Sequence, residues 1–364
     1  MTWIALADHS ERRFSLHGIG TDRRDTPICD DGPDHVLPRG SLLFETRLSP
    51  DGRPQLLFGY NNDFPWPRSL KFQAIPGGGI AMVQAVAKNI THATVPHKNA
   101  SRTDVLRVTF SWDAPNEWGR LTVECPEDGT SVAVAVKNPK PVSISDLRDL
   151  MLGHGSQSFA ADMVFAALSD QIEPVGPMPT LAPSTPIATP DGYVAAKDLR
   201  RGDLVMTDRG ETVPVLHCVQ RCVPARGSFA PVWLRAPYFG LLQDIVVSPE
   251  QRIVITGSDV EYLFNQEAVL VPARHLTNGF SARSVRPGTL ASYTQLVLPG
   301  HNSLTAAGAQ LESLYIGRIR RKPDQLAASL LAGIDRKTLP EHGGSVFPVL
   351  RWYEAVTLTT QRVA

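Results

Sequence analysis

His217, Cys218 and Cys222 are the residues whose types and spacing come closest to a metal site. Zinc prefers thiolate and imidazole ligands and gathers about four of them around the ion. The surrounding sequence is typical of a strand, where successive side chains point to opposite faces, so His217 faces away from both cysteines. Two cysteines four residues apart on one strand are also too far apart to form a disulfide bond with each other. We therefore expect no metal or other cofactor and interpret both cysteines as small buried or half-buried residues.

The remaining histidines and cysteines form no clearer pattern. The ten histidines lack helical or close-strand ligand spacing, which argues against a metal-dependent hydrolase. Cys29 and Cys125 bring the cysteines to four, too few for a disulfide framework in a chain of 364 residues.

The charge balance excludes several partners. Lys and Arg number 36, as do Asp and Glu, so no long-range field attracts nucleic acid or an anionic membrane surface. The basic run 318–322 is short and predicts a solvated loop or helix end.

No stretch is long enough for a membrane span, and the first residues do not resemble a Sec signal peptide. We expect a protein that stays in the cytoplasm or leaves by a route independent of such a signal; the oligomeric state stays open.

Short apolar runs between turn residues predict a mostly β architecture. In the first half such runs are 41–48, 56–60, 79–84, 105–112, 120–124 and 131–136. Leu106, Val108 and Phe110 alternate with Arg107, Thr109 and Ser111, which indicates antiparallel sheets with one face buried. Pro50–Gly52 and Glu127–Gly129 are tight-turn sequences. Residues 144–152 predict a short helix or the approach to a final strand, and 159–168 that last strand.

The order of these strands, the hairpin 112–123 and the ending 152–170 resemble a laminin-G/concanavalin-like jelly roll. This resemblance implies a sandwich whose edge loops bind a carbohydrate or a protein surface. Trp3, Trp66, Trp112 and Trp118 fit equally well as exposed anchors or as core residues.

A proline-rich segment marks the domain boundary. Residues 173–179 hold three prolines, which fix φ and remove backbone donors, so we expect an extended linker. The expected organisation is a sandwich over 1–172, the linker 173–179, a second all-β domain over 180–320 and a partly helical extension over 321–364 that packs on it.

Three ordered blocks of the second half carry the most specific pattern. The first is Thr185-Pro-Ile-Ala-Thr189-Pro-Asp-Gly192 followed by Asp198-Leu-Arg-Arg-Gly202-Asp203-Leu-Val205. The second is Ser248-Pro-Glu-Gln251, and the third runs from Tyr293 through Val297 and His301-Asn302 to Gly308. Together they resemble the bacterial branch of the Hedgehog/intein (Hint) autoprocessing domains, over residues 178 to about 320. The resemblance implies a horseshoe-shaped all-β fold.

The resemblance also implies a reaction and its residues. In the family, a first cysteine attacks the preceding carbonyl, and a histidine of the second block assists as a general acid. The corresponding positions here hold Thr180 and Gln251, and a further histidine of the bacterial branch corresponds to Gln295. Only His301 remains of the usual set. Threonine is a far poorer nucleophile than cysteine, and glutamine exchanges no proton at neutral pH.

We therefore expect a degenerate Hint module that does not cleave itself, joined to a binding sandwich and acting as a binding or scaffold protein. The alternative is an active protein that cleaves the Pro179–Thr180 bond with Thr180 as nucleophile and help from His301. Splicing is not expected, because the segment 357–364 lacks the terminal Asn followed by a nucleophile; His301-Asn302-Ser303 mimics that junction only inside the third block.

Overall fold

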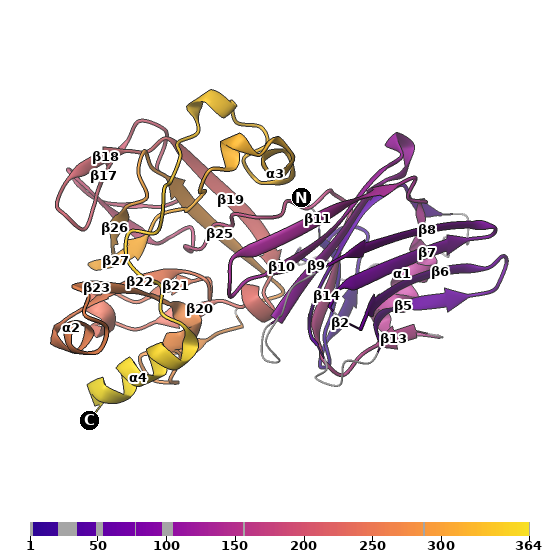
Figure 1. Ribbon diagram of the computed structural model, residues 1–364, viewed down its shortest axis with the longest axis horizontal. Coiled ribbons are helices and arrows are strands. Elements are labelled where there is room, and N and C mark those ends of the chain that lie inside the picture. The colour runs from indigo at the N-terminus through magenta and orange to yellow at the C-terminus, as the bar shows by residue number, and fades with distance from the viewer. Residues whose placement is uncertain are drawn as a thin grey trace. The chain divides into compact units, whose positions relative to one another are not determined.

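The computed structural model describes residues 3–20, 35–48, 54–76, 78–96, 105–155, 157–286 and 288–363. Cys29 and the predicted turn Pro50–Gly52 lie outside these ranges. The chain forms two compact units, Met1–Pro174 and Val175–Ala364. Both are built mainly from antiparallel strands (Figure 1).

The first unit is a β-sandwich. Its larger sheet has the order β11-β10-β9-β4-β14-β1-β2, and its smaller sheet has the order β13-β5-β6-β7-β8. The larger sheet comprises β1 (Trp3–Ala7), β2 (Arg12–Phe14), β4 (Arg39–Arg47), β9 (Val105–Asp113), β10 (Trp118–Cys125), β11 (Thr130–Lys137) and β14 (Met163–Ser169). The smaller comprises β5 (Gln55–Asn62), β6 (Arg68–Ala74), β7 (Ile80–Val86), β8 (Asn89–Val95) and β13 (Gln157–Phe159). A two-stranded pair, β3 (Val36–Leu37) with β12 (Val142–Ser143), completes it.

The two sheets of the sandwich share one core of large aromatic side chains. Phe44 of the larger sheet packs against Phe58 and Phe72 of the smaller, with ring centroids 5.7 and 5.1 Å apart. Phe110 stacks on Trp112, whose indole N–H donates to the Leu37 carbonyl at 3.0 Å. Fully burying rings of this size is the main favourable term for a sandwich, since each removes a large apolar area from water.

The alternation in β9 (Val105–Asp113) predicts one buried face, whereas both faces of this strand are buried. Leu106, Val108 and Phe110 face the core as expected, but Arg107, Thr109 and Ser111 on the other face are also buried. Arg107 donates to Glu45 at 3.1 Å and lies 3.8 Å from Glu124, so charges on the neighbouring strands pair with this buried residue. A polar alternation therefore does not show that a face is open to water when cross-strand partners satisfy it.

The end of the sandwich also differs from the prediction. Residues 144–152 form the helix α1 (Ile144–Leu152) rather than the approach to a final strand. The strand predicted over 159–168 is confirmed only from Met163 onward, because Phe159 ends β13 of the smaller sheet and β14 of the larger sheet begins at Met163. A turn between them, with the Met163 N–H donating to Ala160, carries the chain from one sheet to the other. The turn Glu127–Gly129 is confirmed, with Gly129 at a φ of 62°.

The second unit contains four small sheets. Their orders are β16-β15-β26-β27-β22-β23, β17-β18, β19-β25 and β21-β20-β24. The strands are β15 (Pro186–Thr189), β16 (Gly192–Ala195), β17 (Leu204–Met206), β18 (Thr212–Pro214), β19 (His217–Pro224), β20 (Val232–Leu234), β21 (Ile245–Val247), β22 (Arg252–Thr256), β23 (Ala268–Pro272), β24 (Ala282–Ser284), β25 (Leu290–Val297), β26 (Ser303–Ala306) and β27 (Ala309–Glu312). The helices are α2 (Ser258–Phe264), α3 (Pro323–Ala328) and α4 (Trp352–Val363).

The last segment of the chain packs on this unit. Val269 and Leu350 contribute to one buried cluster, to which α4 adds Ala355 and Leu358. The Leu270 N–H donates to the Pro348 carbonyl, and the Leu350 N–H donates back to Leu270. The extension is thus attached by both main-chain pairing and apolar contact.

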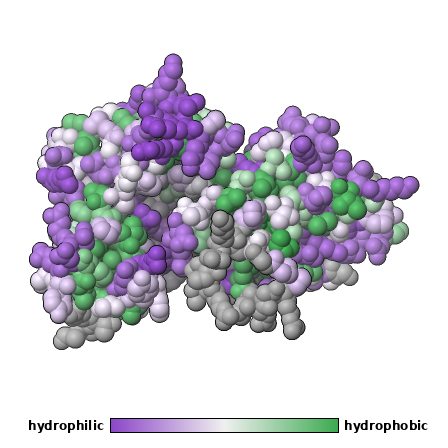
Figure 2. Space-filling model, in the orientation of Figure 1, coloured by the Kyte–Doolittle hydropathy of each residue, from purple (hydrophilic) through white to green (hydrophobic). Residues whose placement is uncertain are grey.

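The basic run 318–322 is partly paired. Arg320 and Arg321 both bind Glu341, and these hydrogen bonds lower the pKa of that carboxyl to about 2. Figure 2 shows a strongly hydrophilic surface over the region around α3. Within the described ranges, none of the helices combines the length and the apolar character needed to cross a membrane.

Candidate functional site

Thr180 lies where the proline-rich segment 173–179 joins the sheets of the second unit. The residue is 8 % exposed, and its carbonyl accepts from the Ser248 N–H at 2.6 Å. The next residue, Leu181, bridges two strands at once: it exchanges hydrogen bonds with Thr294 of β25 and pairs with Val247 of β21. The backbone therefore fixes Thr180 from both sides before any side-chain contact is counted.

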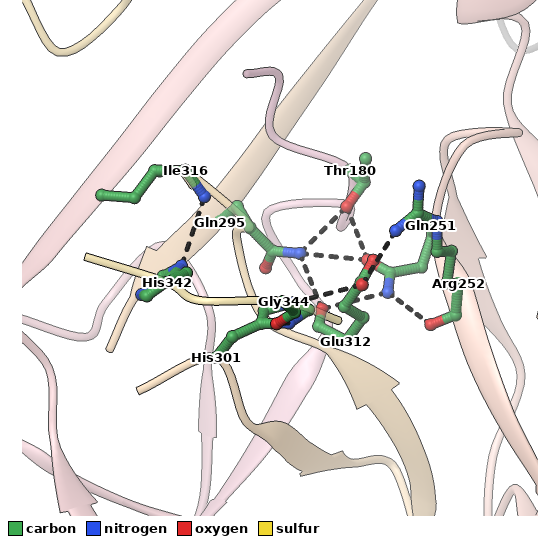
Figure 3. Close-up of polar contacts among 9 residues, drawn as sticks. All are labelled: Thr180, Gln251, Arg252, Gln295, His301, Glu312, Ile316, His342 and Gly344. Carbon is green, nitrogen blue, oxygen red and sulfur yellow. Dashed lines mark hydrogen bonds and ion pairs between the residues drawn. The ribbon is translucent and has the colours of Figure 1, made fainter. Parts of the chain in front are cut away.

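The hydroxyl of Thr180 lies between two glutamine side chains, as Figure 3 shows. It donates to Oε1 of Gln251 at 2.5 Å and accepts from Nε2 of Gln295 at 2.9 Å. Gln251 and Gln295 are each 1 % exposed. Three of the four positions that the sequence singled out, far apart along the chain, thus lie in direct contact.

The hydrogen bonds also fix which way both amides point. Nε2 of Gln251 faces the carbonyl oxygens of Arg252 and Glu312, at 2.8 and 3.1 Å. Nε2 of Gln295 faces the same Glu312 carbonyl at 3.1 Å. Carbonyl oxygens only accept, so an amide NH₂ group must occupy these positions and the amide oxygen of Gln251 must face Thr180.

The chemical consequence follows from the groups themselves. A general base must take the hydroxyl proton as the oxygen attacks, and among the described residues the acceptor of that proton is the Gln251 amide oxygen. Amide oxygens are not basic near neutral pH, and the Gln295 amide occupies a lone pair of the hydroxyl. The arrangement orients Thr180 but offers it no proton transfer.

His301 belongs to a neighbouring polar group. Its side chain is 2 % exposed, and Nδ1 lies 3.2 Å from the Gly344 carbonyl. Nε2 lies 3.1 Å from Oε1 of Glu312, as an ion-pair contact rather than an aligned hydrogen bond. The same carboxylate oxygen accepts from Arg252 at 3.0 Å. The polar contacts of His301 thus run to Glu312 and Gly344, and among the described residues Glu312 links it to the Thr180 network (Figure 3).

Two residues of this region, Glu312 and His342, were not recognised as site residues from the sequence. Glu312 connects both groups, its main-chain oxygen to the glutamines and its carboxylate to Arg252 and His301. Its position shortly after the third block, which ends at Gly308, was the available signal. His342 stacks on His301 at 5.6 Å and accepts from the Ile316 N–H; burial, with the nearby His301, lowers its pKa. No spacing in the sequence relates residue 342 to residue 301.

The cysteine and histidine group of β19 takes no part in this network. Cys218 and Cys222 are half-buried, and burial raises the pKa of Cys218. His217 lies 3.2 Å from the Thr338 hydroxyl. Over the described ranges, no three or more His, Cys, Asp or Glu side chains are arranged to hold a metal ion.

Comparison with known proteins identifies the second unit. Residues 179–318 match the Hint domain family, so this part of the chain is a Hint domain. No curated protein is significantly similar to the chain.

Three solved structures overlap parts of the chain at low identity. The MchDnaB-1 intein is 15% identical, with 37% of this chain and 98% of the intein covered and a TM-score of 0.26. The CBM40 of the Ruminococcus gnavus IT-sialidase, bound to α2,3-sialyllactose, is 12% identical, with coverage of 36% and 62% and a TM-score of 0.23. The winged bean acidic lectin, complexed with methyl-α-D-galactose, is 10% identical, with coverage of 36% and 70% and a TM-score of 0.20. TM-scores this low do not establish a fold or a ligand.

Proposed function

We propose that the Hint domain of this chain is a catalytically silent scaffold in which Thr180 is a structural residue. The observation that supports this proposal is the Thr180 hydroxyl held between the amides of Gln251 and Gln295. Cleavage would require this oxygen to attack the Pro179 carbonyl carbon, forming an ester while the Pro179–Thr180 C–N bond breaks and the amine takes up a proton. Neither amide can accept the hydroxyl proton or supply one to the amine.

The hydrogen bonds of the two amides also explain how the site is stable without catalysis. Gln251 and Gln295 together satisfy the buried carbonyls of Arg252 and Glu312 and both sides of the Thr180 hydroxyl. A buried polar group left without a partner costs about 1–3 kcal/mol, so a complete neutral network stabilises the unit. Substitutions that remove a reaction can in this way leave a stable junction behind.

The first test is intact mass spectrometry of the full chain, with and without hydroxylamine, which intercepts an ester. We expect one species at full length under both conditions after days of incubation. A product ending at Pro179 would overturn the proposal and favour the alternative, in which Thr180 is a working nucleophile.

The sandwich supplies the second half of the proposed function, the binding of a carbohydrate or a protein surface as a laminin-G/concanavalin-like module. The turn between β5 and β6 supports this, because it presents Phe64 at 85% exposure and Trp66 at 39%. The Arg68 guanidinium lies 5.4 Å from the Trp66 ring, which holds the indole in one orientation. A fixed, half-exposed indole is a suitable surface for the apolar face of a sugar ring.

A glycan array probed with the full chain tests this half. We expect bound glycans to be lost by about tenfold or more in Trp66→Ala, the loss typical of an interface anchor. Trp118→Ala is a matched control, since Trp118 has the same 39% exposure and a similar arginine contact, with Arg120, but lies in the other sheet. An unchanged array in Trp66→Ala, or no bound glycan at all, would contradict a sugar site on this turn.

A further inference from the structure

A hollow of about 490 Å³ opens on the surface of the Hint domain, formed by the turn after β16 and by β19. Its lining includes Lys197, Arg200 and Arg201 from the turn and His217 and Cys218 from the strand. The volume lies in the usual range of ligand pockets, ~300–1,000 Å³, but the lining is mainly polar and the hollow is open. These properties fit a charged, solvated ligand group rather than an apolar one.

The charge of the hollow is strongly one-sided. Lys197, Arg200 and Arg201 form no ion pair with any described residue, and none of the described lining residues is acidic. The carboxylate of Asp203 binds the main-chain N–H of Arg200 at 2.7 Å instead. Both guanidinium groups act on side chains of β19. Burial raises the pKa of Cys218, and the charge of Arg200 partly offsets this rise. Burial lowers the pKa of His217, and the charge of Arg201 lowers it further. Three cations around one hollow repel each other, and this repulsion is relieved when an anion binds between them.

The turn that carries the cations is held rigidly. The Gly202 N–H donates to Val215 at 2.8 Å, and the Asp203 N–H donates to Arg200 at 3.1 Å. A fixed backbone lowers the ordering cost of binding. Arg200 and Arg201 occupy the two unspecified positions of the block Asp198-Leu-x-x-Gly202-Asp203, so the family resemblance does not account for them.

We propose that this hollow binds an oxyanion group, a phosphate or a sulfate, through Lys197, Arg200 and Arg201. The guanidinium groups offer paired N–H donors that match the geometry of such groups, and the lysine adds a point charge. None of the residues belongs to the Thr180 network, so the proposal does not depend on whether the chain cleaves itself.

The experiment is isothermal titration calorimetry of the full chain with two probes, pyrophosphate and a sulfated disaccharide, at low and at moderate salt. We expect one site whose affinity falls with salt, and a loss of about tenfold or more in both Arg200→Gln and Arg201→Gln, since each removes charge-assisted hydrogen bonds. Arg209→Gln is the matched control, an exposed arginine of the neighbouring β17–β18 turn outside the hollow, and should bind within about twofold of the parent.

The tighter of the two probes identifies phosphate or sulfate as the source of the oxyanion. Heat from neither probe at millimolar concentration would overturn the proposal. Binding that survives both substitutions, or that weakens equally in Arg209→Gln, would also overturn it. Melting curves of all variants are needed beside the titrations, and because the three arginines are exposed, we expect them to coincide with the parent.

Discussion

A chain carrying both Thr180→Cys and Gln251→His should release two fragments at the bond between residues 179 and 180 when treated with dithiothreitol. The thiol supplies a nucleophile that ionises near neutral pH, and the imidazole supplies a group that protonates the departing amine. An N–H directed at the Glu312 carbonyl, where Nε2 of Gln251 lies at 3.1 Å, would leave the other ring nitrogen facing residue 180. The thiolate attacks the Pro179 carbonyl carbon, the C–N bond breaks, and dithiothreitol then displaces the resulting thioester.

The single variants separate the two contributions. We expect the double variant to cleave about 100-fold faster than Thr180→Cys alone, the usual size of a general acid–base contribution, and Gln251→His alone to stay intact. Intact mass spectrometry over time gives all three rates. If the double variant folds and remains whole, the silence of the domain would rest on more than these two residues, and Gln295→His would be the third substitution to add.

Asp146→Ala should lower the free energy of unfolding of the sandwich by about 3–5 kcal/mol, because it leaves a buried guanidinium without its counter-ion. Arg68 of β6 donates to Asp146 of α1 through Nε at 2.7 Å and Nη2 at 2.9 Å. The two residues are 8 % and 2 % exposed, and Asn62 donates to the same carboxylate at 2.7 Å. Burial raises the pKa of the nearby Tyr60, and the charge of Asp146 raises it further. This pair fastens the helix to the smaller sheet.

The measurement must report on the sandwich alone, since a chain of two units does not unfold in one transition. Hydrogen exchange of peptides from β6 and α1 in the full chain does so. Asp149→Ala on the same helix is the matched control: Asp149 lies 3.9 Å from His154 with both side chains well exposed, so the loss should stay below about 1 kcal/mol. Replacing both partners, as Arg68→Met with Asp146→Leu, should restore most of the lost stability, and failure to do so would show that packing rather than charge carries the effect.

Much of the fold can be predicted from local patterns of residue types in the sequence. Phe110 and its neighbours alternate as a strand, and the blocks around Thr180, Gln251 and Gln295 predict the second unit, because family patterns record which residues meet in space. The strand predicted over 159–168 is correct from Met163 onward but begins too early, for a physical reason. Two short strands of different sheets look like one long strand when the turn between them, here at Ala160, contains no glycine or proline.

The polar partners were harder to foresee than the positions they serve. The contact of Glu312 through its main-chain oxygen carries no side-chain signal, and any residue at 312 would accept there. His342 lies in an extension that reaches its neighbours only through tertiary packing, 44 residues from the Leu298 carbonyl that faces its ring. The buried charges of β9 were missed because Arg107 finds partners on two other strands, a pairing that one strand's alternation cannot contain.

The way the proline-rich segment 173–179 enters the Hint domain has a mechanical consequence. Four main-chain hydrogen bonds hold residues 180–182: the mutual pair between Leu181 and Thr294, the bond from Ala182 to Val246 and the bond from Ser248 to Thr180. They lie on two strands from distant parts of the chain, one on each side of the entering segment. Tension on the segment 173–179 is therefore shared among several hydrogen bonds that must break together. The junction resists stretching more than a single edge strand does when its hydrogen bonds break one after another.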